Sequence, residues 1–341
     1  MWDMSLVTPI DAEEIPDRLR RPAIEIRGLR KRYGDLEAVK GIDLEVPTGE
    51  LFGFLGPNGA GKSTTIKILC TLVRPTSGDA LVAGFNVVEE RNEVRRHIGL
   101  VFQEPTLDEY LTAEQNLRFH AEIYGIPRAA VAARLDSVLE MVGLGDRRKD
   151  KVSGFSGGLK RRLEIGRGLL HSPRVLFLDE PTIGLDPHSR VTLWNYVDQL
   201  RVQEAITVFL TTHYMDEAER CDRIAIIDQG RIVVIGTPAG LKAGVGQDRI
   251  RIRTANDTAA AETIVTGLGV RAIATSDGVD VFTDDGEGFV PRIFELGLSV
   301  QSVTVTKPTL DDVFLAYTGN RIDDAGGSVG LPAGPWSRKR G

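Results

Sequence analysis

The segment GPNGAGKST at residues 56–64 constrains the fold of this 341-residue chain more than any other part of it. It matches the pattern GxxxxGK[ST], follows the apolar run at 51–55 and precedes a helix-like run at 64–70. Glycines let successive backbone N–H groups turn toward phosphate oxygens, and the N-terminus of the helix adds positive potential. The sequence therefore predicts a strand, a phosphate-binding loop and a helix. The candidate phosphate-binding residues are Gly56, Pro57, Asn58, Gly59, Ala60, Gly61, Lys62, Ser63 and Thr64.

Strand-like and helix-like runs alternate around this loop, from residue 23 to about residue 246. Short β-branched or apolar runs predict strands at 23–26, 51–55, 98–102, 175–178, 206–210 and 224–227. That alternation favours an α/β domain with a mostly parallel sheet. Between about 104 and 160 the strand-like runs stop, and LTAEQNLRFHAEIYG and AAVAARLDSVLEMVG carry apolar residues at helical spacing. We expect a helical insertion there.

The pattern changes after residue 246. RIRIRT alternates with period two, RAIATSDGVDVFT has two strand-like runs around a turn, and SVQSVTVT is strand-like. Helical patterns separate these runs, so residues 247–319 are predicted to form a small α+β domain. Residues 1–22 are predicted to be a flexible leader, and the glycine-rich residues 320–341 a disordered tail.

Composition excludes several classes of protein. Hydrophobic residues make up 42% and charged residues 26% of the chain, which excludes disordered and fibrous proteins. No run approaches the ~18 uncharged apolar residues of a membrane helix, and the first residues lack the apolar core of a secretory signal. Cys70 and Cys221 have neither disulfide nor metal spacing, so we expect buried thiols in a reducing compartment. The net charge of -6 gives no general attraction to nucleic acid.

A second motif, RVLFLDEP at 174–181, separates the classes of protein that share a phosphate-binding loop. Its apolar strand ends in Asp179 and Glu180, at the edge of the sheet where ligands of open α/β sheets bind. We predict that Lys62 contacts the β and γ phosphates, that Ser63 and Asp179 hold Mg²⁺, and that Glu180 polarises the attacking water. A GTPase would need an Asn-Lys-x-Asp motif, which the sequence lacks.

The third motif is FSGGLKRR at 155–162. Together with the phosphate loop, LDEP, Gly184-Leu185-Asp186 and His213, it resembles the nucleotide-binding subunit of ATP-binding cassette (ABC) transporters. The resemblance covers about residues 24–238. The nearest subgroup is the drug-export ATPases of the daunorubicin-resistance type, which end in a small domain with a segment similar to PTLDDVFL at 308–315.

The resemblance implies roles for further residues. Tyr33 would stack on adenine, and Gln103 would sense Mg²⁺ and the γ-phosphate and relay that state to a membrane partner. His213 would contact the γ-phosphate. Asp186 would lie between two subunits, and the signature residues would meet the ATP held by the other subunit; these are Ser156, Gly157 and Gly158. The other histidines are expected to be solvated or packing residues, and these are His97, His120, His171 and His188.

The family also implies a function. The chain would be the ATP-hydrolysing subunit of an exporter, acting as a homodimer with Mg-ATP on the cytoplasmic face of a separate membrane permease. Leu159 stands where many members have glutamine, so contacts across the dimer are expected to differ while activity persists. Two alternatives stay open: export of a lipid or polysaccharide, and a soluble ATPase acting on ribosomes or DNA. The single phosphate loop and the absence of a heptad run disfavour the second alternative.

Residues 308–319 predict a helix with an apolar stripe, which must pack against another surface. Leu310, Val313, Phe314 and Tyr317 lie at i, i+3, i+4 and i+7. Either the stripe covers the sheet of its own small domain, or it docks this domain on the ATP-binding domain and stabilises the dimer or the membrane assembly.

Overall fold

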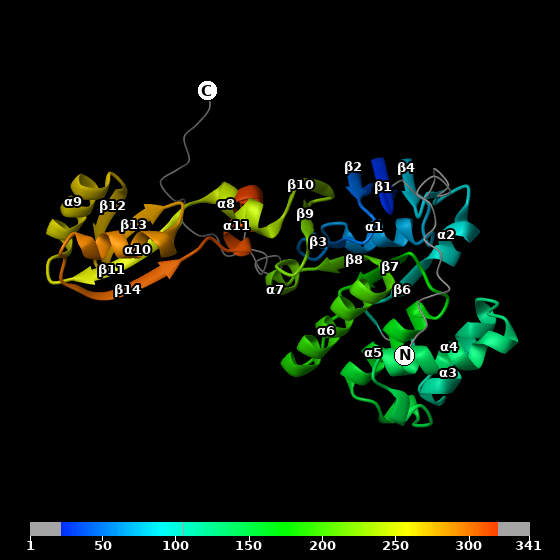
Figure 1. Cartoon of the computed structure of the whole chain (residues 1–341). Helices are drawn as coiled ribbons and strands as arrows, with labels where there is room; N and C mark the ends of the chain where they lie inside the picture. The colour runs from blue at the N-terminus through cyan, green and yellow to red at the C-terminus, as the bar shows by residue number, and fades with distance from the viewer. Residues whose placement is uncertain (1–21, 105, 320–341) are drawn as a thin grey trace, which may run out of the picture. The chain divides into compact units, whose positions relative to one another are not determined.

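The computed structural model describes residues 22–104 and 106–319 (Figure 1). The predicted leader and tail therefore lie, apart from Pro22, outside the described residues. The chain divides into two compact units, Met1–Ile235 and Gly236–Gly341. The division falls before the helix α8 (Pro238–Val245), whereas the sequence predicts a boundary after it. The described helices are too short or too polar to cross a membrane.

The first unit contains two sheets. The four-stranded sheet has the order β2-β1-β4-β5, and the six-stranded sheet has the order β10-β9-β3-β8-β7-β6. The strands of the first sheet are β1 (Ile24–Tyr33), β2 (Leu36–Val46), β4 (Ser77–Val82) and β5 (Phe85–Asn86). Those of the second are β3 (Leu51–Leu55), β6 (Ile98–Val101), β7 (Val175–Asp179), β8 (Thr207–Thr212), β9 (Arg223–Asp228) and β10 (Arg231–Gly236).

The α/β fold class is confirmed, with one difference in strand arrangement. Strands β6, β7, β8, β3 and β9 pair in parallel, as the sequence predicts. The first predicted strand, at 23–26, does not join them, because β1 pairs with β2 and β4 in antiparallel fashion. A separate antiparallel sheet therefore lies beside the parallel one.

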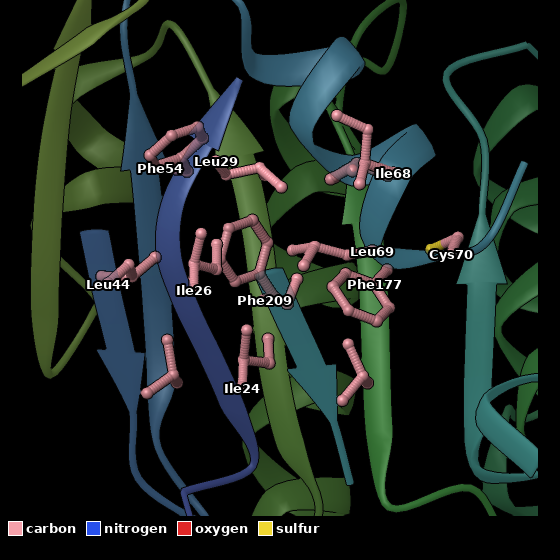
Figure 2. Packing of buried hydrophobic residues seen from close by; sticks show 14 of the residues in the cluster. Ile24, Ile26, Leu29, Leu44, Phe54, Ile68, Leu69, Cys70, Phe177 and Phe209 are labelled. Atoms are coloured by element: carbon pink, nitrogen blue, oxygen red, sulfur yellow. The ribbon is translucent and has the colours of Figure 1, made fainter. Parts of the chain in front are cut away.

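One apolar core contains side chains from both sheets. Phe209 of β8 lies 5.6 Å, centroid to centroid, from Phe52, Phe54 and Phe177 on the neighbouring strands. Figure 2 shows Ile24 and Ile26 of β1 in the same cluster as Phe54, Phe177 and Phe209, with Ile68 and Leu69 of the helix α1 (Lys62–Leu69). Each such side chain contributes roughly 1.5–3 kcal/mol when fully buried. This core anchors the strand ends that carry the predicted chemistry.

Helices complete the first unit. The predicted insertion contains α3 (Ala113–Ile123) and α4 (Arg128–Met141), which share an apolar core with α5 (Gly157–Leu169). A capping box at Thr112 and Gln115 fixes the start of α3. The remaining helices are α2 (Arg91–His97), α6 (Pro187–Glu204) and α7 (Met215–Ala218), with short 3-10 turns at Gly145–Arg147 and Val152–Gly154. Cys70 and Cys221 are free and buried, as expected.

The second unit is an α+β structure. Its sheet has the order β12-β13-β11-β14, and each neighbouring pair of strands is antiparallel. The strands are β11 (Asp248–Thr254), β12 (Arg271–Thr275), β13 (Gly278–Thr283) and β14 (Val300–Thr306). Helices α9 (Asp257–Leu268) and α10 (Gly286–Glu295) pack on the sheet, and Ile250, Ile264, Val281 and Ile293 lie in the shared core.

The apolar stripe lies on α11 (Leu310–Thr318), which packs against α8 within the second unit. Leu310, Val313 and Phe314 are buried, whereas Tyr317 is 44% exposed. Three of the four stripe residues are therefore already covered in the single chain. Helix α8 is part of this cover, and the core that backs the sheet does not include the stripe.

Replacing Phe314 with aspartate is expected to loosen the α8–α11 pair. Removing a buried phenylalanine typically costs about 3–5 kcal/mol, and a buried unpaired carboxylate adds to this. Hydrogen exchange should therefore rise in both helices of the variant. Tyr317→Asp on the same helix is the matched control and should leave their exchange near that of the parent. Unchanged exchange in Phe314→Asp would contradict this packing.

Candidate active site

The phosphate-binding loop joins β3 to α1 and needs glycine at specific positions. Gly61 has φ +110, and a Cβ there would lie 2.6 Å from the carbonyl oxygen of Ala38. A Cβ on Gly56 would lie 2.3 Å from the carbonyl oxygen of Ile227. No side chain caps α1, so its first N–H groups are left for another acceptor. The loop thus has the backbone that anion binding requires.

Lys62 lies inside this loop and is only 4% exposed. Its ammonium donates to the carbonyl oxygens of Gly56 at 2.7 Å and Pro57 at 3.1 Å, and lies 3.1 Å from Oε1 of Glu180. Burial lowers the pKa of Lys62, and the Glu180 carboxylate opposes that effect. The ammonium is thus held at the centre of the loop, next to the acidic strand end.

Asp179 and Glu180 lie at the end of β7, where the sequence predicts them. Oδ1 of Asp179 accepts from Thr211 Oγ1 at 2.5 Å and from Ser63 Oγ at 3.4 Å. Oε2 of Glu180 lies 3.1 Å from Nδ1 of His213. The strand end therefore brings Lys62, Ser63, Glu180 and His213 into one cluster.

A cavity of about 280 Å³ adjoins this cluster. Tyr33, Gln103 and Glu180 line it together with Leu36, Ala38 and the loop residues Pro57, Asn58, Gly59, Gly61, Lys62, Ser63 and Thr64. The Tyr33 ring is 45% exposed, with the Lys31 ammonium 4.9 Å from its centroid. Predicted residues from four segments thus meet at one cavity. The sequence pattern singled out neither Leu36 nor Ala38, because their role depends on where β2 lies.

Of the residues that the structure describes, those that line this cavity include neither the signature residues nor Asp186. Ser156 caps α5 by accepting from the Leu159 N–H, and Asp186 caps α6 by accepting from the Ser189 N–H at 3.0 Å. The Ser189 bonds lower the pKa of Asp186. A Cβ on Gly158 would lie 2.6 Å from Ser189 Oγ, so the two helix starts are adjacent. Both Ser156 and Asp186 are exposed.

The other histidines behave as the sequence predicts. The His97 ring stacks on Phe85, the His171 ring stacks on Tyr124 at 3.8 Å between centroids, and His188 is exposed. His120 is half-buried on α3 and packs edge-on against Phe119.

Stability should depend on pH through His120. Burial and then the charge of Arg167 lower the pKa of His120 from 6.5 to about 4. As pH falls, the unfolded chain binds a proton at His120 before the folded chain does. The neutral His120 therefore contributes its full share of the free energy of unfolding above pH 6.5, and this share is lost as pH falls toward 4. His120→Gln should flatten the dependence of Tm on pH in that window, and His188→Gln serves as the exposed control. Parallel Tm curves for the parent and His120→Gln would contradict this.

The sequence motifs did not single out two residues near the site, Thr211 and Arg161. Thr211, which bonds Asp179, looked like an ordinary strand residue. Arg161 on α5 is 5% exposed and bonds the main chain on both sides of Glu180. The signal for Arg161 was its i, i+3 spacing from Glu164, but the basic run around it is typical of an exposed helix.

Comparison with known proteins places this geometry in a family. The family model described as "ABC transporter" matches residues 39–183. The daunorubicin/doxorubicin resistance ATP-binding protein DrrA of Streptomyces peucetius is 43% identical, over 89% of this chain and 94% of that protein. The linearmycin resistance ATP-binding protein LnrL of Bacillus subtilis (strain 168) is 38% identical, over 88% and 100% of the two chains.

Solved structures show the same fold. A cbiO1 protein from Clostridium perfringens, part of the ABC transporter complex cbiONQ, matches with a TM-score of 0.61 and 27% identity, covering 73% of this chain and 96% of that one. A dimeric ATP-binding cassette in a post-hydrolysis state, bound to ADP and Pi, matches with a TM-score of 0.57 and 26% identity, covering 63% and 98%. The chain belongs to the ABC transporter ATP-binding proteins and is an ATPase subunit.

Proposed function

We propose that the chain powers a drug exporter: two copies close around two Mg-ATP molecules on the cytoplasmic face of a membrane permease, and hydrolysis reopens them. Hydrophobic antibiotics are the proposed cargo. The relatives named for daunorubicin, doxorubicin and linearmycin resistance support this cargo by analogy. Export of a lipid or polysaccharide remains the alternative within the same architecture.

The proposed catalytic mechanism rests on one observation, the position of Glu180. Its carboxylate lies 3.1 Å from both Lys62 Nζ and His213 Nδ1, at the edge of the loop cavity. In the proposed mechanism Lys62 moves from its carbonyl partners to the β and γ phosphates, and Glu180 accepts a proton from the attacking water. His213 contacts the γ-phosphate, and Tyr33 stacks on the adenine.

The residues at the site fit a magnesium ion. Ser63 Oγ and Asp179 Oδ1 lie 3.4 Å apart, and Gln103 lines the same cavity. All three offer oxygen atoms, which Mg²⁺ prefers. The ion would neutralise charge on the phosphates. Thr211 holds the Asp179 carboxylate in place for this role.

The dimer part of the proposal rests on the separation of the signature from the loop cavity. Ser156 caps the helix that begins at Gly157, and the residues lining the cavity of the same chain include none of Ser156, Gly157 and Gly158. A second copy related by a two-fold axis would supply that N-terminus to the phosphates, and would receive the same in return. Asp186, adjacent to the signature, would then lie at the contact between the copies.

A groove beside Gln103 suits the permease. It measures about 730 Å³, and Leu72, Phe102, Thr106, Ile123 and Tyr124 contribute to its lining. Leu72, Ile123 and Tyr124 are 48%, 61% and 40% exposed. Because Phe102 and Thr106 flank Gln103, an apolar segment of the permease seated here would sense movement of that residue. Docking here would also place the chain at the membrane.

Transport into inside-out vesicles tests the proposal. The chain is co-expressed with a membrane protein encoded beside it, and ATP-dependent uptake of an anthracycline is followed by fluorescence. We expect uptake with the parent chain, none with Glu180→Gln, and membrane fractionation only when the permease is present. If ATP drives uptake of lipid or polysaccharide but not drug, the alternative cargo holds. Membrane fractionation without the permease would contradict the proposed partner.

A further inference from the structure

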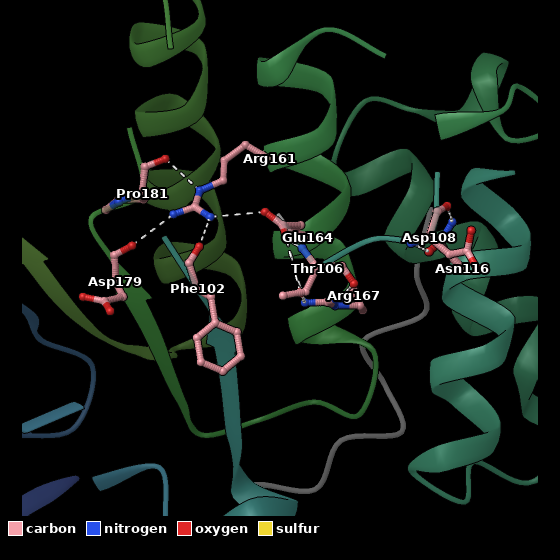
Figure 3. Close-up of polar contacts among 9 residues, drawn as sticks. All are labelled: Phe102, Thr106, Asp108, Asn116, Arg161, Glu164, Arg167, Asp179 and Pro181. Carbon is pink, nitrogen blue, oxygen red and sulfur yellow. Dashed lines mark hydrogen bonds and ion pairs between the residues drawn. The ribbon is translucent and has the colours of Figure 1, made fainter. Parts of the chain in front are cut away.

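Arg161 is a buried arginine that contacts the main chain of two segments of the site at three points (Figure 3). Its Nε donates to the carbonyl oxygen of Pro181 at 2.7 Å, and its Nη2 donates to that of Asp179 at 3.2 Å. Its Nη1 donates to the carbonyl oxygen of Phe102 and, at 3.2 Å, to Oε2 of Glu164. One planar guanidinium thus binds the main chain before Gln103 and on both sides of Glu180.

The backbone of Glu180 needs such support. Glu180 has φ +47, in the left-handed region that is sterically unfavourable for a residue other than glycine. Its N–H donates to both the carbonyl oxygen and Oγ1 of Thr211, each at 3.1 Å. Pro181 has no N–H to donate, so its carbonyl is the only main-chain polar group that can anchor it, and Arg161 binds that group. Strained residues of this kind persist where their surroundings hold them firmly.

Glu164 extends the contact to the segment after Gln103. It is fully buried, its Oε1 accepts from the Thr106 N–H at 2.8 Å, and its Oε2 faces Arg161. Arg167, one turn further along α5, donates to the carbonyl oxygen of Thr106 at 2.9 Å and to its Oγ1 at 2.6 Å. Helix α5 therefore holds residues on both sides of Gln103, at Phe102 and at Thr106.

We propose that Arg161 is a positioning residue, which sets Glu180 and Gln103 relative to the helix that begins at the signature. When a second copy contacts and displaces the start of α5, the Arg161 guanidinium moves with the helix. Its hydrogen bonds then shift the main chain around Glu180 and before Gln103. Hydrolysis thereby depends on closure of the dimer. The inference rests on the proposed roles of Glu180 and Gln103.

Lysine cannot replace arginine in this role. Four acceptors surround the guanidinium in nearly fixed directions, and an ammonium has only three donors and no planar fork. A role that needed only positive charge beside Glu164 would be served by lysine. The conservative substitution therefore separates positioning from charge balance.

The test measures kcat, KM for ATP and ATP affinity of the purified full-length chain. The variants are Arg161→Gln, Arg161→Lys and the double variant Arg161→Met with Glu164→Met, which removes both buried charges so that neither is left unpaired. The matched control is Arg162→Gln, because Arg162 on the same helix bonds Tyr196 and Val142 rather than the catalytic segments. Thermal melting reports whether each variant folds.

We expect kcat to fall by at least ~10-fold in all three Arg161 variants, with ATP affinity within about 3-fold of the parent and Arg162→Gln near the parent. A kcat within about twofold of the parent in the double variant or in Arg161→Lys would overturn the proposal. Equal losses of kcat and affinity would also overturn it, because they indicate a general folding defect. If Glu180→Gln keeps full turnover, the assignment of Glu180 fails instead.

Discussion

Replacing Glu180 with glutamine should lower steady-state ATP turnover by ~10²-fold or more while ATP binding persists. Glutamine keeps the shape of the side chain and the contact with Lys62, but it cannot accept a proton from water. The cavity in which we propose that the nucleotide binds is lined mainly by the phosphate loop, so the affinity for ATP should change little.

Turnover and equilibrium binding of a fluorescent ATP analogue measure the two effects separately. Glu122→Gln, an exposed glutamate on α3, is the matched control and should behave as the parent. Turnover of Glu180→Gln within about twofold of the parent would rule out Glu180 as the base.

The same variant should form a stable dimer with Mg-ATP, and Ser156→Arg should abolish it. With hydrolysis blocked, the proposed closed state should accumulate, because the helix start at Ser156 of the other copy would complete each phosphate loop. A bulky side chain at this exposed helix cap would hold the copies apart.

Light scattering with and without ATP measures the dimer, and a crosslink through a cysteine at Asp186 gives an independent readout. Ser276→Arg, at an exposed turn of the second unit, is the matched control and should dimerise normally. If the Ser156→Arg, Glu180→Gln double variant dimerises as well as Glu180→Gln alone, the signature has another role.

The parts of the site that follow from chemistry were predictable from the sequence. A loop that binds phosphate needs glycines at residues such as Gly61, and an acidic strand end needs the apolar run before it, so both motifs carry their own signal. Parallel pairing then brings the end of β7 to the loop.

The parts that depend on tertiary contacts were not predictable in the same way. Strand β2 mixes charged and apolar residues over 36–46, and only its pairing with β1 makes it a strand that brings Leu36 and Ala38 to the cavity. Arg161 sits in a basic run, and its burial follows from the packing of α5 against the ends of β6 and β7. Helix α8 belongs with α11 because of a contact between segments about 70 residues apart, which no local pattern reveals.

Mixing two inactive variants tests the central claim, that the working site is shared between two copies. Lys62→Ala disables the phosphate loop, and Gly157→Asp disables the signature by placing a carboxylate where the phosphates bound by the other copy would lie, so each variant alone should hydrolyse little ATP. In a mixed dimer the intact loop of one copy faces the intact signature of the other, and one complete site is restored. The account predicts that ATP turnover rises on mixing well above the sum of the two separate variants. Turnover equal to that sum, with mixed dimers verified by crosslinking, would contradict it.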